Sequence, residues 1–122
     1  MKRMTLEIRD TINRNLTEAR ECRMFKDFSR CWTLLEDAHV LSQPWARVHV
    51  RVHGSMFVAE IVQRDIREIR RQVLRFLVGG PASAVGKYPM GNTGRARVPA
   101  MQPMPIRSDL AMMLERSGQR TT

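Results

Sequence analysis

Apolar side chains recur every three or four residues along four stretches of the chain, with charged side chains between them. This spacing is typical of amphipathic helices that bury one face. It predicts helices over residues 5–24, 27–42, 44–63 and 64–80. The residues expected to face the core are Ile8, Ile12, Leu16 and Ala19 in the first helix, Phe28, Cys31, Trp32, Leu35 and Ala38 in the second, Trp45, Val48, Val52, Met56 and Ala59 in the third, and Ile66, Ile69, Val73, Phe76 and Leu77 in the fourth.

Residues at the ends of the predicted helices support these boundaries. Thr5 can cap the first helix, and Asp27 or Ser29 can cap the second. Pro44 suits the first turn of the third helix. The Gly-Gly-Pro run at 79–81 is expected to end the fourth helix, because glycine ends helices well and proline does not continue them.

The residues after 80 have a different composition. Proline, glycine and methionine are frequent from 81 to 107, and a turn signal occurs in the Gly-Asn-Thr-Gly run at 91–94. The methionines make this segment too apolar for a plain solvated linker, so an extended arm lying on the helices is expected. Ser108 or Asp109 is expected to cap a short final helix.

Together these elements predict an all-α fold in one domain, residues 1–122. Two helical hairpins form a four-helix antiparallel bundle over about residues 5–80. An extended Pro/Gly/Met-rich arm and a short C-terminal helix follow over about residues 81–118. Gly54 lies in the middle of the third predicted helix, where glycine costs roughly 1 kcal/mol relative to alanine. Its presence indicates that another helix packs closely there.

The formal net charge of +9 is unevenly distributed. Residues 1–63 hold 10 Lys/Arg and 8 Asp/Glu, whereas residues 64–122 hold 11 Lys/Arg and 4 Asp/Glu. The basic C-terminal half could bind nucleic acid, anionic lipid or an acidic partner protein, or it could be a solvated face. Aromatic residues are few and no helix-turn-helix or RNA-binding motif is present. A nucleic-acid-binding or acidic-partner-binding protein is therefore kept as the alternative function, with nucleic acid the less favoured partner.

The sequence has no feature of an exported or membrane-spanning protein. No apolar run approaches the roughly 20 residues that a membrane helix needs. The N-terminal MKRMTLEIRD lacks the apolar stretch of a secretory signal. Cys22 and Cys31 have no CxxC spacing and are expected to be reduced thiols in the core. A cytoplasmic location is expected, and a protein partner or a homo-oligomer stays open.

All three histidines of the chain fall in the second and third predicted helices. His49 and His53 are four residues apart, so they share one helix face, at the spacing by which two imidazoles chelate one metal ion. Glu36 and His39 form an E-x-x-H pair, which carboxylate-bridged metal bundles use on their helices. A short turn joins the two helices and makes them antiparallel neighbours. The pattern predicts a metal site formed by these four residues.

Glu68 is a candidate fifth residue of this site. It lies with Asp65 and Gln72 on one polar strip of the fourth predicted helix, and it could bind the metal or orient a histidine. Imidazole and carboxylate ligands suit zinc first, and also copper, nickel or iron. The alternatives are a hydrogen-bonded His/Glu network without metal, and unrelated packing. No nucleophile, nucleotide loop or cofactor motif is present, so a metal-binding protein without catalysis is favoured over a metalloenzyme.

Several phrases of the chain resemble a family of small bacterial proteins catalogued as domain of unknown function number 3703. The similar phrases are L-E-D-A-H-V-L-S-Q at 35–43, H-V-R-V-H at 49–53, the Asp-Glu-Gln-Arg pattern of 65–75, G-N-T-G at 91–94 and M-P-I at 104–106. Members of that family are often encoded near heavy-metal resistance genes. The resemblance therefore implies a role in heavy-metal homeostasis or resistance.

Overall fold

The computed structural model describes residues 3–63, 66–84 and 103–121, with the side chains of 66–69 and 80–84 left undescribed. The described residues form helices and no strand, which confirms the predicted all-α class. The helices are α1 (Leu6–Met24), α2 (Phe28–Ser42), α3 (Ala46–Gln63), α4 (Ile66–Ala84) and α5 (Ser108–Arg116).

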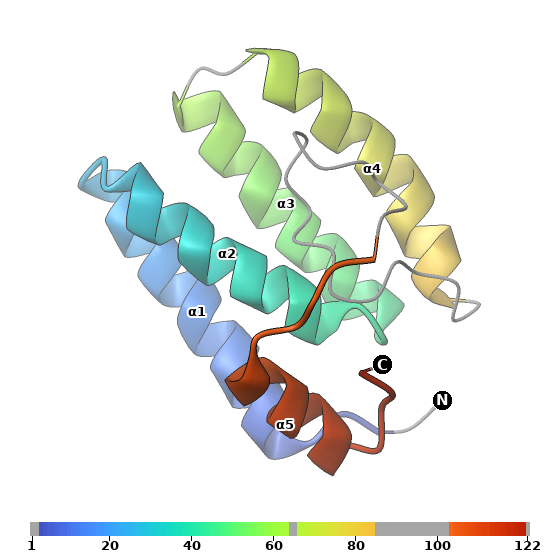
Figure 1. Ribbon diagram of the computed structural model, residues 1–122. Helices are drawn as coiled ribbons and strands as arrows, with labels where there is room; N and C mark the ends of the chain where they lie inside the picture. The colour runs from blue at the N-terminus through green and yellow to red at the C-terminus, as the bar shows by residue number, and fades with distance from the viewer. Residues whose placement is uncertain (1–2, 64–65, 85–102, 122) are drawn as a thin grey trace.

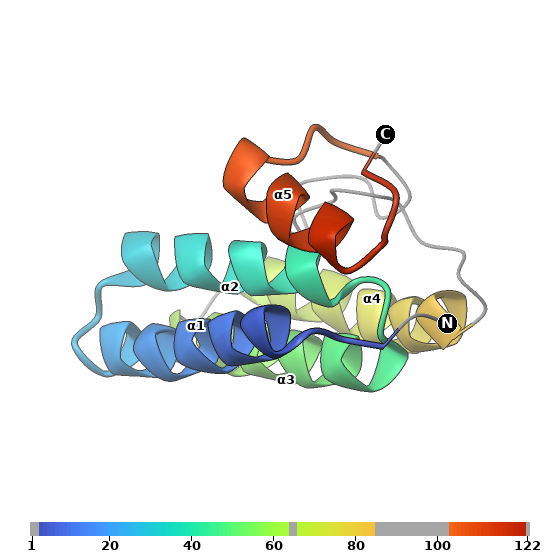
Figure 2. The ribbon, with the colours of Figure 1, turned by 90° about the horizontal axis from the view of Figure 1, so that it is seen from below.

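Among the first four helices, those that follow one another in the chain pack side by side and run in opposite directions (Figure 1). α1 packs on α2, α2 on α3, and α3 on α4, and α1 also touches α3. Within the described residues, α4 packs on α3 and on no other helix. α5 lies across α1 and α2 (Figure 2). The helix α3 therefore connects a core made by α1, α2 and α3 with the separate contact made by α4.

The core follows the apolar pattern of the first three predicted helices, which is confirmed. Its centre is apolar and almost fully buried, and α5 adds two leucines to its edge. The buried apolar residues are Ile8, Ile12 and Ala19 of α1, Cys31, Trp32, Leu35, Ala38, Val40 and Leu41 of α2, Trp45, Val52, Met56 and Ala59 of the turn and α3, and Leu110 and Leu114 of α5. Cys22 and Cys31 are not joined in a disulfide bond. Leu16, Phe28 and Val48 pack against this core and are half-buried.

Two predicted helix caps are present. Thr5 Oγ1 accepts a hydrogen bond from the backbone N–H of Ile8 at 3.3 Å, and Asp27 Oδ1 accepts one from Arg30 at 3.3 Å. These bonds satisfy backbone donors that the first turn of a helix leaves without partners. The starts of α1 and α2 are therefore determined by local side-chain chemistry as the sequence indicated.

The predicted cap of α5 is wrong. The N-cap residue is Arg107 and it makes no side-chain capping bond, whereas Asp109 lies inside the first turn. The Arg107 guanidinium instead bonds Asp109 at 2.6 Å and Asp37 of α2 at 2.7 Å. A tertiary ion pair therefore replaces the local cap, and it holds the start of α5 against α2.

The predicted inward face of α4 is also wrong. Val73, Phe76 and Leu77 are 45%, 44% and 66% exposed, so the described part of this apolar stripe points outward. The side chains of Ile66 and Ile69 lie outside the described residues. Gln72 and Arg75 are only 1% and 7% exposed. The polar stripe of α4 is the buried one because it faces the histidine rings of α3 and not an apolar surface.

Two glycines also differ from expectation. The helix α4 continues through Gly79 and the proline at 81 to Ala84, so the Gly-Gly-Pro run does not end it. Helix propensity is a weak constraint that tertiary packing can override. Gly54 does not mark a close approach, since a Cβ at this position would meet no atom of the other described residues within 4 Å.

The predicted arm falls largely outside the described residues. Residues 81–84 belong to α4, residues 85–102 are not described, and residues 103–107 lead into α5. The course of the arm over the helices stays a prediction. Among the helices of the described ranges, none combines the length and the apolar character that crossing a membrane requires.

Candidate metal centre

The three histidines meet at the end of the α2–α3 hairpin. His39 lies one turn before the end of α2, and His49 and His53 lie in the first half of α3. The short turn between the helices places these segments side by side (Figure 1). Each histidine is only 3% exposed. The predicted facing of His39 with the H-x-x-x-H pair is therefore present in the structure.

The imidazole nitrogens converge at the spacing of metal ligands. His53 Nε2 lies 3.2 Å from His39 Nε2 and 3.2 Å from His49 Nε2. One ligand atom from each residue can be chosen so that all three lie within 4.8 Å of one another. Zinc bonds imidazole nitrogen at about 2.0–2.1 Å, so two nitrogens of a tetrahedral ion stand about 3.3 Å apart. The cluster can thus hold a transition-metal ion.

Hydrogen bonds to the opposite ring nitrogens determine the tautomers of two histidines. Ser42 Oγ donates to the backbone carbonyl of His39 at 3.0 Å, so its lone pairs accept from His49 Nδ1 at 3.0 Å. Gln72 Oε1 can only accept, so His53 Nδ1 donates to it at 3.3 Å. Both rings therefore carry their proton on Nδ1. Their Nε2 atoms expose lone pairs to the centre of the cluster, as metal-binding histidines do.

Burial keeps these imidazoles neutral. Burial first, and the neighbouring His53 second, lower the pKa of His49 to about 3, although a hydrogen bond to the His39 backbone acts in the opposite direction. Burial likewise lowers the pKa of His53 to about 4, with the positive charge of Arg75 acting in the same direction and the Gln72 bond opposing it. A histidine must be neutral to bind a metal. The two rings are therefore in the binding form at neutral pH.

The cluster has fewer protons than lone pairs. With His49 and His53 protonated on Nδ1, only His39 can place a proton among the three Nε2 atoms. One N–H donates to one acceptor well, so two lone pairs still face each other at close range in a buried site. Such an arrangement costs free energy unless a cation lies between the nitrogens.

Gly79 of α4 covers the cluster. A Cβ built at this position would lie 3.5 Å from His49 Nε2, 3.5 Å from His53 Nε2 and 3.6 Å from His49 Cδ2. The backbone of α4 thus approaches the Nε2 atoms of His49 and His53 directly, and the absence of a side chain keeps space beside them.

The structure brings together three of the five predicted site residues. Glu36 is half-buried and is not in the group that could share a metal ion. The side chain of Glu68 lies outside the described residues, so its predicted role stays a prediction. The backbone position of Glu68 is eleven residues before Gly79, about 16 Å along α4 at 1.5 Å per residue. Glu60 is fully buried on α3 and is also outside the group.

Several residues around the cluster had no role in the sequence prediction. Ser42 orients His49, Arg75 lies near His53, and Gly79 adjoins two rings. Gln72 was noted only as part of a polar strip. The sequence does contain a signal for Gln72, Arg75 and Gly79. They follow one another at helical spacing and so mark a second face of α4, separate from the apolar stripe.

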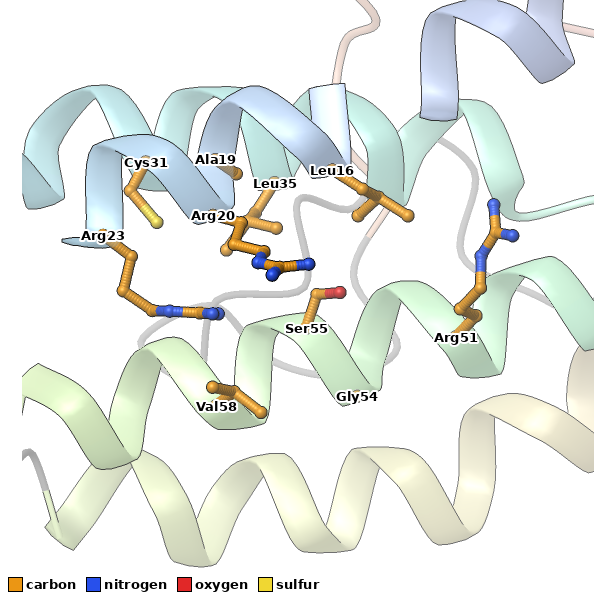
Figure 3. A pocket seen from close by; sticks show the side chains of 10 residues that line it. All are labelled: Leu16, Ala19, Arg20, Arg23, Cys31, Leu35, Arg51, Gly54, Ser55 and Val58. Atoms are coloured by element: carbon orange, nitrogen blue, oxygen red, sulfur yellow. The ribbon is translucent and has the colours of Figure 1, made fainter. Parts of the chain in front are cut away.

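Two pockets lie along α3. One, with a volume of about 260 Å³, adjoins the His53 ring between α3 and α4, and its other walls are largely apolar side chains such as Phe57 and Phe76. The second, with a volume of about 310 Å³, lies between α1, α2 and α3 and does not include the histidines. Arg20 and Arg23 of α1 extend toward α3 there (Figure 3). Arg20 and Arg23 belong to the N-terminal half, whereas the predicted acidic-partner surface is in residues 64–122. This pocket therefore does not test that surface, which stays a prediction.

Comparison with known proteins supports the resemblance. Residues 6–114 match the family described as "Protein of unknown function (DUF3703)". The chain belongs to this family. The match spans all five described helices except the last residues of α5, so the histidine hairpin lies well inside the DUF3703 region. No curated protein and no solved structure matches the chain.

Proposed function

We propose that this DUF3703 protein binds one divalent transition-metal ion, zinc first and otherwise copper, nickel or iron, through the Nε2 atoms of His39, His49 and His53. The observation that carries the proposal is the convergence of three buried nitrogens at 3.2 Å contacts. Imidazole is a ligand for each of these metals. The ligand set does not include Glu36, which is not in the cluster. It also does not include Glu68, whose backbone lies about 16 Å along α4 from Gly79.

The surroundings of the rings support a built site over chance packing. Ser42 and Gln72 are almost fully buried, and each holds one histidine through Nδ1. Partners of this kind fix ring orientation and raise metal affinity. A hydrogen-bonded network without metal would need a proton between each close pair of Nε2 atoms. The Nδ1–H tautomers instead leave the Nε2 atoms of His49 and His53, 3.2 Å apart, both as acceptors.

The proposed cellular role is the handling of a heavy metal, as a buffer or a delivery protein. A ligand set of three neutral side chains adds no negative charge to the ion, so the bound ion keeps its full charge of +2. An ion that keeps its full charge is attracted to negatively charged ligands, so such a site suits transfer of the metal to a partner with charged ligands better than permanent storage of the metal. Cells that express the wild-type protein should tolerate more of the metal than cells that express His53→Gln.

The direct test is a zinc titration of tag-free protein in competition with a chelating dye. A tag-free chain is needed because the three histidines are the only ones in the sequence. Wild type should bind one zinc per chain, and His39→Gln, His49→Gln and His53→Gln should each lose most of that affinity. Val52→Ala is the matched control, since Val52 is fully buried on the same helix but offers no ligand. Variants that keep wild-type affinity would refute the proposed ligand set.

A further inference from the structure

The ligand set leaves a tetrahedral ion one ligand short. Within the described ranges, the group of metal-binding side chains consists of His39, His49 and His53, with no carboxylate or thiol. Zinc sites with three protein ligands keep the fourth position for a water molecule or another exogenous group. A tetrahedral ion held by these three histidines would therefore have one coordination position that no side chain of the described group fills.

The fourth position faces Gly79. In a tetrahedral site the fourth ligand atom stands about 3.3 Å from each nitrogen. A Cβ at position 79 would lie 3.5 Å from two of them, His49 Nε2 and His53 Nε2. Glycine thus leaves position 79 without a side-chain atom where the fourth ligand would stand, and among the described residues this space suits a ligand of a few atoms.

The charge around this position favours an anion. Arg75 lies four residues before Gly79, on the same face of α4, and is 7% exposed. Gln72 and Gly79, the positions before and after Arg75 on this face of α4, both adjoin the His53 ring, so Arg75 lies on the face that meets the rings. Three neutral imidazoles leave the divalent ion uncompensated, and buried charge requires a counter-charge. Glu60, the buried acid of α3, is seven residues beyond His53, about 10 Å along the helix.

We propose that the metal centre keeps one exchangeable coordination position between the histidine rings and Gly79, and that it binds a small monovalent inorganic anion there with the help of Arg75. This inference rests on the proposed metal-binding function. In the binding step the anion replaces a water molecule on the metal. One metal–oxygen bond breaks and one metal–anion bond forms, no electron is transferred, and the charge of the centre falls by one.

The apolar pocket beside His53 strengthens this preference. Its walls include Phe57, Val73 and Phe76, so one side of the centre is bordered by groups that do not solvate ions. Electrostatic attraction between the anion and the two cations is stronger in such surroundings than in water. The site should therefore select anions over neutral ligands of similar size.

The test uses the tag-free full-length protein loaded with cobalt(II), whose visible ligand-field absorption reports its coordination. Cobalt uptake is measured first, and sodium azide is then titrated at constant ionic strength. Wild type should show a saturable spectral change with one azide per cobalt. If cobalt does not bind, the proposed metal site itself fails. If cobalt binds and saturating azide leaves the spectrum unchanged, the metal site stands and the exchangeable position is refuted.

Variants of α4 test the role of Arg75. Arg75→Gln should bind cobalt and weaken azide affinity by about tenfold or more, because one positive charge near the anion is lost. Arg75→Lys should recover most of this affinity, since it keeps the charge. Arg70→Gln is the matched control, because it removes the same charge from an exposed position of the same helix. Equal azide affinity in Arg75→Gln and wild type would refute the role of Arg75. If Arg75→Gln does not fold, the azide titration of the wild-type protein still tests the exchangeable coordination position.

Discussion

Replacement of Gly79 by alanine should stabilise the metal-free protein and weaken metal binding. The methyl group would make ordinary van der Waals contacts of 3.5–3.6 Å with the histidine rings, so it fits the metal-free fold. Alanine is about 1 kcal/mol more favourable than glycine inside a helix. The same methyl group would stand close to the fourth ligand position of a bound ion. The two effects have opposite signs, which separates metal binding from folding.

The size of the effect follows from binding linkage. Zinc at 100 times its dissociation constant stabilises the folded state by about 2.7 kcal/mol. If Gly79→Ala weakens binding about 100-fold, the same zinc concentration adds only about 0.4 kcal/mol. Without metal, the free energy of unfolding should therefore be about 1 kcal/mol higher for the variant than for wild type. With zinc, it should be roughly 1–1.5 kcal/mol lower for the variant than for wild type.

The assay is urea unfolding of both tag-free proteins, with a chelator and with zinc. Gly54→Ala is the matched control, because it makes the same change inside α3, where the new Cβ meets no atom of the rest of the described chain within 4 Å. It should gain stability without metal and keep the full zinc effect. A Gly79→Ala protein that gains as much stability from zinc as wild type would show that the ion does not lie beneath α4.

Three further predictions concern the surroundings of the site. Ser42→Ala leaves the His49 Nδ1–H without this acceptor, and a chelator competition assay should show zinc affinity about 10-fold to 100-fold lower; unchanged affinity would remove Ser42 from the site. The metal-free protein should lose stability as the pH falls, because His49 and His53 have pKa values of about 3 and about 4 when folded, against 6.5 when unfolded. The unfolded chain then binds more protons between pH 6.5 and pH 4, so the unfolding free energy is complete above pH 6.5 and falls below it by up to about 1.4 kcal/mol per pH unit for each histidine; urea midpoints that stay constant from pH 7 to pH 4.5 would contradict this. Asp37→Asn weakens the ion pair with Arg107 and should raise amide hydrogen exchange in α5 at a cost of about 1 kcal/mol or less, because the pair is partly exposed; unchanged exchange in α5 would show that the pair does not hold this helix.

The first three helices could be predicted because their apolar stripes are also their buried faces. Ile12, Leu35 and Val52 sit at the centres of stripes that the spacing alone identifies. The fourth helix carries two stripes, one apolar and one polar, and the apolar one is exposed. Sequence periodicity identifies both but cannot tell that Gln72 faces a histidine ring. Only the tertiary partner decides which stripe is buried.

The histidines of the site could also be predicted, since the i, i+4 spacing puts His49 and His53 on one face and the short turn brings His39 to a similar depth along the hairpin. The carboxylate could not. Glu36 and His39 lie three residues apart on a helix, which separates their directions by about 60° at 3.6 residues per turn. Whether both reach one ion depends on the rotation of α2 about its axis, which the core packing of residues such as Trp32 and Leu35 determines. Gly79 could not be assigned a role because glycine has no side chain whose chemistry could mark it.

X-ray absorption spectroscopy of the zinc-loaded, tag-free protein tests the central claim most directly, because it counts the atoms bound to the metal. The structure predicts three imidazole nitrogens at about 2.0–2.1 Å and one further light atom that is exchanged by added azide. A sulfur neighbour, or fewer than three imidazoles around the zinc, would contradict the assignment of His39, His49 and His53 as the metal ligands.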